Sequence, residues 1–271
     1  MAAFLTPPLT TTALCWRLER RDGVALGFTT HDRDLEIDGL CYRAAPGMLP
    51  SSISLSDGFG PDTLDVKGAL SADAIRSGDL KAGRWDGATL TVFMVDWQAP
   101  QVDRLAIARG ELGEIAVAGR AFEAELRGPT AQLDRPVVEQ TSPGCRASLG
   151  DKRCRVDMAP RIRLTRVVEV VGEARIEVAE AAAGNAYGYG LVRWMSGPSS
   201  GLSSSVLRSE GTQLILREPP EHAIAVGDLV ELREGCDRSV ATCAGRFANV
   251  ENFRGEPHLP GIDLLTRYPG A

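Results

Sequence analysis

The sequence predicts a mainly β protein, with an N-terminal β-barrel or β-sandwich domain followed by a small β-rich C-terminal domain. Segments rich in alternating, β-branched or aromatic residues recur along the chain at the spacing of hairpins. Only short stretches between them have helical character. Strands that follow one another with little helix between them favour a sandwich or barrel over a parallel α/β fold.

The N-terminal half contains the clearest elements. Segment 88–97 is the strongest predicted strand, because more than half of its residues are β-branched or aromatic. An Asp38-Gly39 turn joins two alternating segments within 35–42, as in a two-residue hairpin. The other predicted elements are strands at 13–18, 24–30, 52–55 and 63–66, a short helix at 72–76 between Ser71 and Gly78, a meander of 105–110, 112–117 and 121–126 with turns at Gly110 and 118–120, and one helical turn at 129–135.

A domain boundary is expected near the middle of the chain. A chain of 271 residues predicts one or two domains. Pro136 and the Thr141-Ser142-Pro143-Gly144 segment interrupt the strand pattern, which predicts domains at 1–138 and 139–271. The elements predicted in the second domain are strands at 162–171, 174–178, 188–195, 213–217 and 228–233, with a mobile Gly/Ser/Pro-rich loop at 196–205.

Composition argues against several classes of function. The formal net charge of −6 and the pI of about 5.3 disfavour a general surface for DNA or RNA. No apolar run approaches the roughly 18 residues that span a bilayer, so we expect no membrane insertion. The N-terminus lacks the basic segment of a signal peptide. We therefore expect synthesis in a reducing cytosol, where six cysteines are ligands or free thiols more often than disulfides.

Four of the cysteines form two pairs on polar, turn-forming loops. Eight residues separate Cys145 from Cys154, six separate Cys236 from Cys243, and 81 lie between the pairs. Four converging thiolates indicate zinc or an iron–sulfur cluster. Zinc sites usually use tighter Cys-x2-4-Cys knuckles, so the wide loops favour a [4Fe–4S] cluster. A zinc site and unrelated thiols or disulfides remain as alternatives.

Basic residues surround both cysteine pairs. Guanidinium groups near a cluster would offset its negative charge and donate hydrogen bonds to sulfur. Acidic residues are interspersed with them, so the same pattern also fits a solvated surface. The basic residues are Arg146, Lys152, Arg153, Arg155, Arg233, Arg238 and Arg246.

The remaining cysteines and histidines predict no catalytic site. Cys15 and Cys41 lie in apolar, strand-like contexts and are expected to be buried small hydrophobes. Segment 31–34 (His-Asp-Arg-Asp) joins two predicted strands, which favours a solvated turn over a metal or acid–base site. His222 and His258 are isolated in sequence, and we expect them to be structural or exposed.

Two features of the chain resemble a known family. They are the cysteine spacings described above and the run Phe247-Ala248-Asn249-Val250-Glu251-Asn252-Phe253-Arg254-Gly255-Glu256-Pro257-His258-Leu259-Pro260-Gly261. The chain resembles the tail-tip or baseplate hub proteins of long-tailed, siphovirus-type phages and of phage-like gene transfer agents. The resemblance covers essentially the whole chain. The stretch between the cysteine pairs is longer than in the lambda-type tail-tip protein, which implies a β insertion at about 162–217.

This resemblance implies a structural virion protein without enzymatic activity. It implies a homotrimeric ring that links the end of the tail tube, on one side, to a large tip or fibre protein on the other. It further implies assembly in the bacterial cytoplasm, location at the tail tip, and a [4Fe–4S] cluster held by Cys145, Cys154, Cys236 and Cys243. DNA would only pass through the ring, whose channel is expected to be acidic or neutral because a basic channel would bind it.

The interface of this ring is predicted from the apolar segments. We expect it to use strand 88–97 or the tail at 259–268, with Arg254 and Arg267 at the polar rim. Rival functions are a cytosolic iron–sulfur redox protein and a zinc-stabilised structural module. A hydrolase would need Cys15 or Cys41 to pair with His31 as nucleophile and base, which the sequence disfavours.

Overall fold

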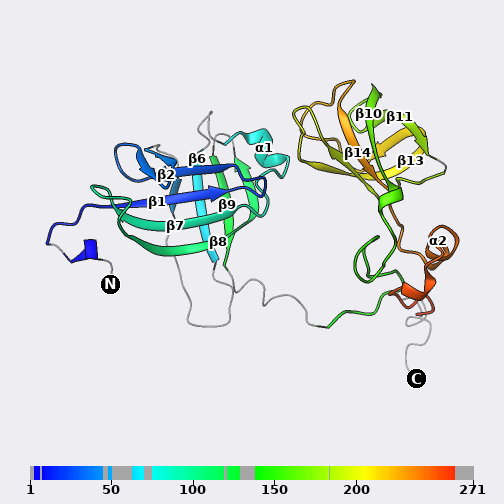
Figure 1. Cartoon of the computed structure of the whole chain (residues 1–271), viewed down its shortest axis with the longest axis horizontal. Helices are drawn as coiled ribbons and strands as arrows, with labels where there is room; N and C mark the ends of the chain where they lie inside the picture. Colours follow the sequence, from blue (N-terminus) through cyan, green and yellow to red (C-terminus); the bar gives the residue numbers. More distant parts are fainter. Residues whose placement is uncertain are drawn as a thin grey trace. The chain divides into compact units, whose positions relative to one another are not determined.

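Figure 1 shows the structure of the chain, a computed structural model in which residues 3–6, 8–44, 48–50, 63–69, 75–118, 121–128, 138–182 and 184–259 are described. The chain divides into two compact units, Met1–Val137 and Val138–Ala271, and each is described by itself. Strands dominate both units, which confirms the predicted mainly β fold class. No helix in the described ranges has the length and apolar character that crossing a membrane requires.

The N-terminal unit is built on one nine-stranded sheet with the order β3-β4-β2-β1-β7-β8-β9-β6-β5. Neighbouring strands are antiparallel except β2 and β4, which are parallel. Its elements are η1 (Ala3–Leu5), β1 (Thr12–Glu19), β2 (Ala25–Thr29), β3 (Leu35–Ile37), β4 (Leu40–Arg43), β5 (Met48–Pro50), β6 (Thr63–Ala69), α1 (Ser77–Lys81), β7 (Thr89–Asp96), β8 (Arg104–Ala118) and β9 (Ala121–Arg127).

The central strands β1 and β7 bury side chains on both faces of the sheet. Trp16 and Leu90 belong to one core cluster, and Cys15 and Phe93 belong to another. The Tyr42 ring packs edge-on against Phe93, with 5.6 Å between the ring centroids. Because successive side chains of a strand point to opposite faces, burial on both faces accounts for the strongly apolar sequence of β7.

The prediction that 88–97 supplies apolar side chains to a subunit interface is wrong. Strand β7 lies between β1 and β8, in the interior of the sheet. Leu90, Val92, Phe93 and Val95 are at most 2% exposed. These side chains are therefore part of the unit's own core.

Strand β8 continues through Gly110 without the predicted turn. A Cβ atom at Gly110 would lie 2.5 Å from the Arg127 carbonyl oxygen and 2.9 Å from Leu126 Cγ. The glycine thus permits close approach of β9 rather than a reversal of the chain. The irregularity lies further along, where the pairing register with β9 shifts between Leu112 and Ile115.

Two local predictions near the chain's turns have different outcomes. The Asp38-Gly39 turn is confirmed, with φ angles of 51° and 75° that match a type I′ hairpin. The helix predicted at 72–76 is not closed by Gly78, because α1 includes that residue and begins after Arg76, whose backbone is extended. Ser71 and the elements predicted at 52–55 and 129–135 lie outside the described residues.

The C-terminal unit contains a closed five-stranded barrel with the order β10-β11-β13-β12-β14 (Figure 1). Its strands are β10 (Ile162–Val170), β11 (Arg175–Ala182), β12 (Leu191–Trp194), β13 (Ser203–Leu216) and β14 (Leu229–Arg233). The buried core of the barrel consists of Val167, Ile176, Val178, Tyr187, Val192, Trp194, Val206, Leu214, Leu216, Val230 and Leu232. The sequence predicted most of these strands but not their closure into a barrel.

Strand β13 is longer than predicted and begins inside the segment expected to be a mobile loop. Residues 203–205 pair with β12, whereas 213–215 pair with β11. The Trp194 indole N–H donates to Ser204 Oγ at 2.9 Å, which gives a small polar residue a fixed position in the strand. Gly211, with a φ of 58°, interrupts the regular strand between the two paired stretches.

The rest of the C-terminal unit is the cysteine lobe, defined here as residues 138–161 and 234–259. It is attached directly to the start of β10 and the end of β14. Its only helical elements are η3 (Ala159–Arg161), α2 (Val240–Gly245) and η4 (Val250–Asn252), and the rest of these described residues form turns and loops. The four paired cysteines all lie in this lobe.

Candidate metal centre

The two cysteine loops are held together by backbone hydrogen bonds. The Cys145 N–H donates to the Arg238 carbonyl at 2.9 Å. The Arg146 N–H donates to the Arg254 carbonyl, also at 2.9 Å. Residues from the first loop therefore lie between two segments that follow β14, although about 90 to 110 positions separate them in the sequence.

Two of the four thiols have a pKa that is raised by burial and by other cysteines. Burial raises the pKa of the Cys243 thiol, and the charges of Cys145, Cys236 and Cys154 raise it further. Burial also raises the pKa of Cys236, to which Cys145 and Cys154 add, whereas the Arg238 backbone N–H opposes the shift. A cation would reverse this balance, since metal binding requires thiolates and releases their protons.

Three of the sulfur atoms accept N–H donors. The Arg254 backbone N–H donates to Cys145 Sγ at 3.3 Å, and the Arg238 backbone N–H donates to Cys236 Sγ at 3.4 Å. The Asn249 side-chain amide approaches Cys154 Sγ at 3.7 Å. Such N–H donors stabilise negative charge on metal-bound thiolates.

The first loop is shaped by Asp151. Its carboxylate accepts the backbone N–H groups of Ser148 at 2.8 Å, Arg153 at 2.8 Å and Cys154 at 2.7 Å. These donors, with that of Cys154 first, hold the pKa of Asp151 below its usual value. The carboxylate thus fixes the backbone at Cys154 in the way that an Asx turn does.

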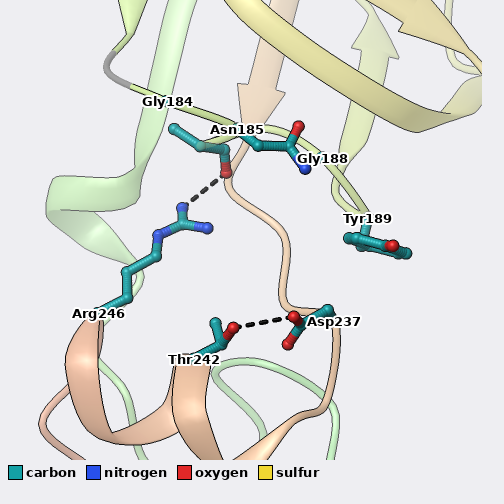
Figure 2. Close-up of a pocket in the computed structure, with 8 residues that line it drawn as sticks. Gly184, Asn185, Gly188, Tyr189, Asp237, Thr242 and Arg246 are labelled. Carbon is teal, nitrogen blue, oxygen red and sulfur yellow. Dashed lines mark hydrogen bonds between the residues drawn. The ribbon is translucent and has the colours of Figure 1, made fainter.

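The second loop leads into α2, which carries Cys243. The Ser239 hydroxyl caps the helix by accepting the Thr242 N–H at 3.2 Å. Asp237 accepts the Thr242 hydroxyl at 2.9 Å, an interaction visible in Figure 2. This local network explains why so short a helix forms directly after Cys236.

Glycines join the lobe to the end of the barrel. A Cβ atom at Gly235 would lie 2.1 Å from the Gly188 carbonyl oxygen and 2.1 Å from the Gly190 nitrogen. A Cβ at Gly190 would lie 2.1 Å from the Arg233 carbonyl oxygen. Only glycine fits this seam, which places the backbone just before Cys236 against the barrel.

Arg246 strengthens the same junction from the side of α2. Its guanidinium donates to the Ala186 carbonyl at 2.6 Å, as Figure 2 shows, and to Glu234 at 2.6 Å. Arg161 binds the same Glu234 oxygen at 2.8 Å, and both guanidinium groups lie within 5 Å of the Phe247 ring centroid. The helix that carries Cys243 is therefore tied to the barrel by charge-assisted bonds.

The site is enclosed on one side and open on the other. Cys154 and Cys243 are buried, whereas Cys145 and Cys236 are half-buried. Cys236 and Tyr189 contribute to a pocket of about 530 Å³. Another pocket of about 330 Å³ lies between α2 and loop 184–189 (Figure 2).

Several of the predicted basic neighbours have other roles. Arg146 forms a two-pronged pair with Glu256, at 2.5 and 2.9 Å, and Arg153 pairs with Glu139. Among the described residues, no guanidinium donates to a cysteine sulfur, and the donors are backbone groups and an amide. The expectation that arginine side chains bind the sulfurs is therefore wrong, because nearby carboxylates bind several of them instead.

The remaining predicted sulfur and imidazole positions lie apart from this site. Cys15 is fully buried in the N-terminal core, as expected. Cys41 is only half-buried, 3.8 Å from Asp34, because β4 lies near the edge of the sheet.

The histidines lie apart from the cysteine lobe's thiols as well. His31 accepts the Arg33 N–H at 3.0 Å and packs against Trp97, so its turn is ordered by local contacts. His258 is exposed, and His222 is half-buried.

Four cysteine thiols are a donor set that both a zinc ion and an iron–sulfur cluster use. The four thiols share one electrostatic neighbourhood. Even so, across the described ranges no three His, Cys, Asp or Glu side chains are arranged to hold one metal ion. A cubane separates its four cysteine ligands more widely than one zinc ion does, because each cysteine binds a different iron.

Comparison with known proteins identifies the family. A model of the baseplate hub protein, N-terminal attachment domain, matches residues 1–157. The chain belongs to the baseplate hub protein family. A second model, phage conserved hypothetical protein BR0599, matches residues 185–263 of this hub protein. Each match contains one of the two cysteine pairs, so the candidate metal centre draws on both matched segments.

A solved structure extends the likeness to the whole length of the hub protein. A chain from the structure titled "Virion of native gene transfer agent (GTA) particle" is 37% identical, with a TM-score of 0.85. The match covers 99% of the hub protein and 94% of that chain. No curated protein matches. Membership of a structural baseplate family confirms the expected non-enzymatic role.

Proposed function

We propose that this baseplate hub protein forms a homotrimeric ring at the tail tip, and that a [4Fe–4S] cluster staples its C-terminal domain. Cys145, Cys154, Cys236 and Cys243 would each bind one iron. The observation that carries the cluster proposal is that hydrogen bonds bring the two cysteine loops together, from Cys145 to Arg238 and from Asn249 to Cys154, although the loops are far apart in sequence. When bound, the cluster would supply a covalent crosslink between the two loops.

The surroundings of the thiols support a cluster. Two backbone N–H groups and one amide already point to sulfur atoms, so the lobe can stabilise thiolates without a basic side chain at each one. Burial and mutual repulsion raise the pKa of Cys236 and Cys243, so these thiols gain most from a cation. Zinc is the weaker candidate, because zinc sites usually use Cys-x2-4-Cys knuckles, whereas eight and six residues separate the cysteines of the two pairs here.

The location at the tail tip is supported by the family and by the gene transfer agent virion. In the ring, one face would contact the end of the tail tube and the other a large tip or fibre protein. DNA would be passing cargo, and assembly would occur in the bacterial cytoplasm. The domains at 1–138 and 139–271, with the β insertion at 162–217, would then provide separate binding surfaces.

The outer face of the barrel is a better interface candidate than the buried strand 88–97. Leu164, Glu231 and Arg193 form one row across β10, β14 and β12. Leu164 is 58% exposed, and Leu191 and Met195 are 40% exposed. Exposed apolar groups with arginine beside them are common in protein interfaces.

Arg254 is exposed as a rim residue requires, whereas Arg267 and 260–268 lie outside the described residues.

Anaerobic purification tests the cluster. We expect a brown protein with about four irons per chain, as a cubane requires. Cys145→Ser, Cys154→Ser, Cys236→Ser and Cys243→Ser should each abolish the absorbance, whereas Cys15→Ser should keep it. Stoichiometric zinc without iron would reject the cluster.

Deleting the gene tests the structural role. Particles from the deletion strain should lack a functional tail tip, and complementation with the wild-type chain should restore it. Electron microscopy of released particles provides the measurement. Complete tails that still deliver DNA would reject the hub assignment and favour a cytosolic redox protein.

A further inference from the structure

We propose that Asn249 is a positioning residue of the metal centre, which holds Cys154 and Cys243 together and donates a hydrogen bond to the Cys154 thiolate. This inference rests on the proposed cluster. It goes further because it gives a role to a side chain that is not itself a ligand. This side chain would affect how firmly the cluster is held and the electron density at one cysteine sulfur.

Asn249 contacts two of the four cysteines. Its side chain contacts Cys154, and its backbone contacts Cys243. The side-chain nitrogen donates to the Cys154 carbonyl at 2.6 Å and approaches Cys154 Sγ at 3.7 Å. The Asn249 backbone N–H donates to the Cys243 carbonyl at 3.0 Å. The Cys243 S–H, which the thiol loses when it binds a metal, also donates to the Asn249 carbonyl at 3.3 Å. One residue therefore connects a cysteine of the first loop to a cysteine of the second.

The orientation of this amide is fixed by Asn252. The Asn252 amide nitrogen donates to Asn249 Oδ1 at 2.7 Å, and its backbone N–H donates to the Asn249 carbonyl at 3.1 Å. Because Oδ1 accepts from Asn252, the nitrogen of Asn249 must face Cys154. Both residues belong to one turn at η4, which follows α2 directly.

Because Asn249 is buried, losing these hydrogen bonds would cost free energy. Asn249 is 8% exposed, and a buried amide is costly unless its donors and acceptor are satisfied. The amide nitrogen has two N–H groups, and the Cys154 carbonyl accepts only one of them. The additional N–H directed at sulfur is the feature that points to the metal centre.

The hydrogen bond from Asn249 differs in kind from the other donors to sulfur. Cys145 and Cys236 receive backbone N–H groups, which any residue at Arg254 or Arg238 supplies. Cys154 receives a side-chain donor, which substitution can remove. N–H donors to cluster sulfurs draw electron density from them, and outer-shell partners strengthen metal retention.

Two variants test this role in the full-length, anaerobically purified protein. Asn249→Asp keeps the shape and the acceptor for Asn252 but removes both donors. Asn249→Ser is too short to reach Cys154. The control is Ser204→Ala, which removes the side-chain acceptor of the Trp194 indole N–H at 2.9 Å within the barrel strands. Iron release to a chelator, the Fe–S stretching bands in resonance Raman spectra, and the melting temperature of the iron-free protein are measured for all four proteins.

We expect both Asn249 variants to release iron about 10- to 100-fold faster than wild type, as loss of outer-shell partners does at metal sites. Their Fe–S stretching bands should shift, whereas Ser204→Ala should match wild type in both measurements. Wild-type rates and bands in both Asn249 variants would overturn the inference and leave the cluster intact. Faster release with unchanged bands and a lower melting temperature of the iron-free protein would also overturn it, because Asn249 would then act only on folding. A wild-type protein without iron would instead reject the cluster itself.

Discussion

The barrel and the cysteine lobe belong to one compact unit, but they are stabilised in different ways. The barrel closes five strands around a core that includes Trp194 and Leu214. None of the three core clusters among the described residues includes a lobe residue. The lobe is held by turns, ion pairs and hydrogen bonds instead, and its longest helix has six residues. A segment with so little apolar burial gains the most from a bound metal centre.

Contacts at the junction between the barrel and the lobe fix the position of the second cysteine loop. The Gly188, Gly190 and Gly235 seam and the Arg246 contacts position the second cysteine loop on the end of the barrel. The first loop reaches the site through contacts with residues 238, 249 and 254. The second loop is thus anchored to the barrel by contacts that need no metal.

The largest expected difference between the two regions follows removal of iron. Chelation should make the lobe susceptible to limited proteolysis at 138–161, while the barrel from β10 to β14 and the N-terminal sheet remain resistant. The reason is that metal-binding free energy contributes directly to folding of the lobe. Mass spectrometry of the fragments checks this, and equal resistance of the lobe with and without iron would contradict it.

A core substitution in the barrel should destabilise the barrel and leave the lobe unchanged. Leu214→Ala removes a fully buried side chain and should lower the free energy of unfolding of the barrel by about 2–5 kcal/mol. Under native conditions the protein should retain its iron. Denaturant titrations followed by hydrogen exchange of barrel peptides and by cluster absorbance measure the two regions separately. Leu164→Ala, at an exposed barrel position, is the control and should change stability by less than about 0.5 kcal/mol.

A substitution at the seam should affect both regions at once. Gly235→Ala places a methyl group 2.1 Å from backbone atoms of residues 188 and 190, which should cost about 1–3 kcal/mol and speed iron loss. Gly245→Ala is the matched control, since its Cβ would have no neighbour within 4 Å. If both variants kept wild-type iron and stability, the barrel would not be positioning the second loop.

The smallest expected effect is a pH dependence of the lobe. Arg146 and the Ser142 N–H hold the pKa of Glu256 below its ordinary value of 4.5. A lowered folded-state pKa stabilises the lobe at pH values above the ordinary value, and this stabilisation is lost as pH falls through the lowered pKa. Because the pair is exposed to solvent, the effect should be small and should weaken in salt.

Melting curves of wild type and Glu256→Gln from pH 7 to pH 3 measure this effect. The difference between the two proteins should be present at pH 7 and should disappear toward the acidic end. A difference that grew as pH fell would show that the Arg146–Glu256 pair does not stabilise the lobe.

Prediction from sequence succeeded where a pattern repeats locally and failed where two segments must meet. Alternation at β1 and β7 and the Asp38-Gly39 turn were readable because each depends on neighbours in sequence. Gly110 suggested a turn, although its role is to admit β9 at close range. The strand at 88–97 suggested an interface because an apolar sequence does not reveal which layer of the protein covers it.

The sequence by itself determined the strand-rich fold class, the two cysteine pairs and, through their spacing, the preference for a cluster. These properties follow from residue type and short-range spacing. The tertiary structure alone decided the closure of the barrel, the glycine seam and the contacts of Asn249 with Cys154 and Cys243. Asn249 lies in the run at 247–261, but its partner is 95 positions away. A hydrogen bond over that separation depends on how the chain packs, which no local pattern encodes.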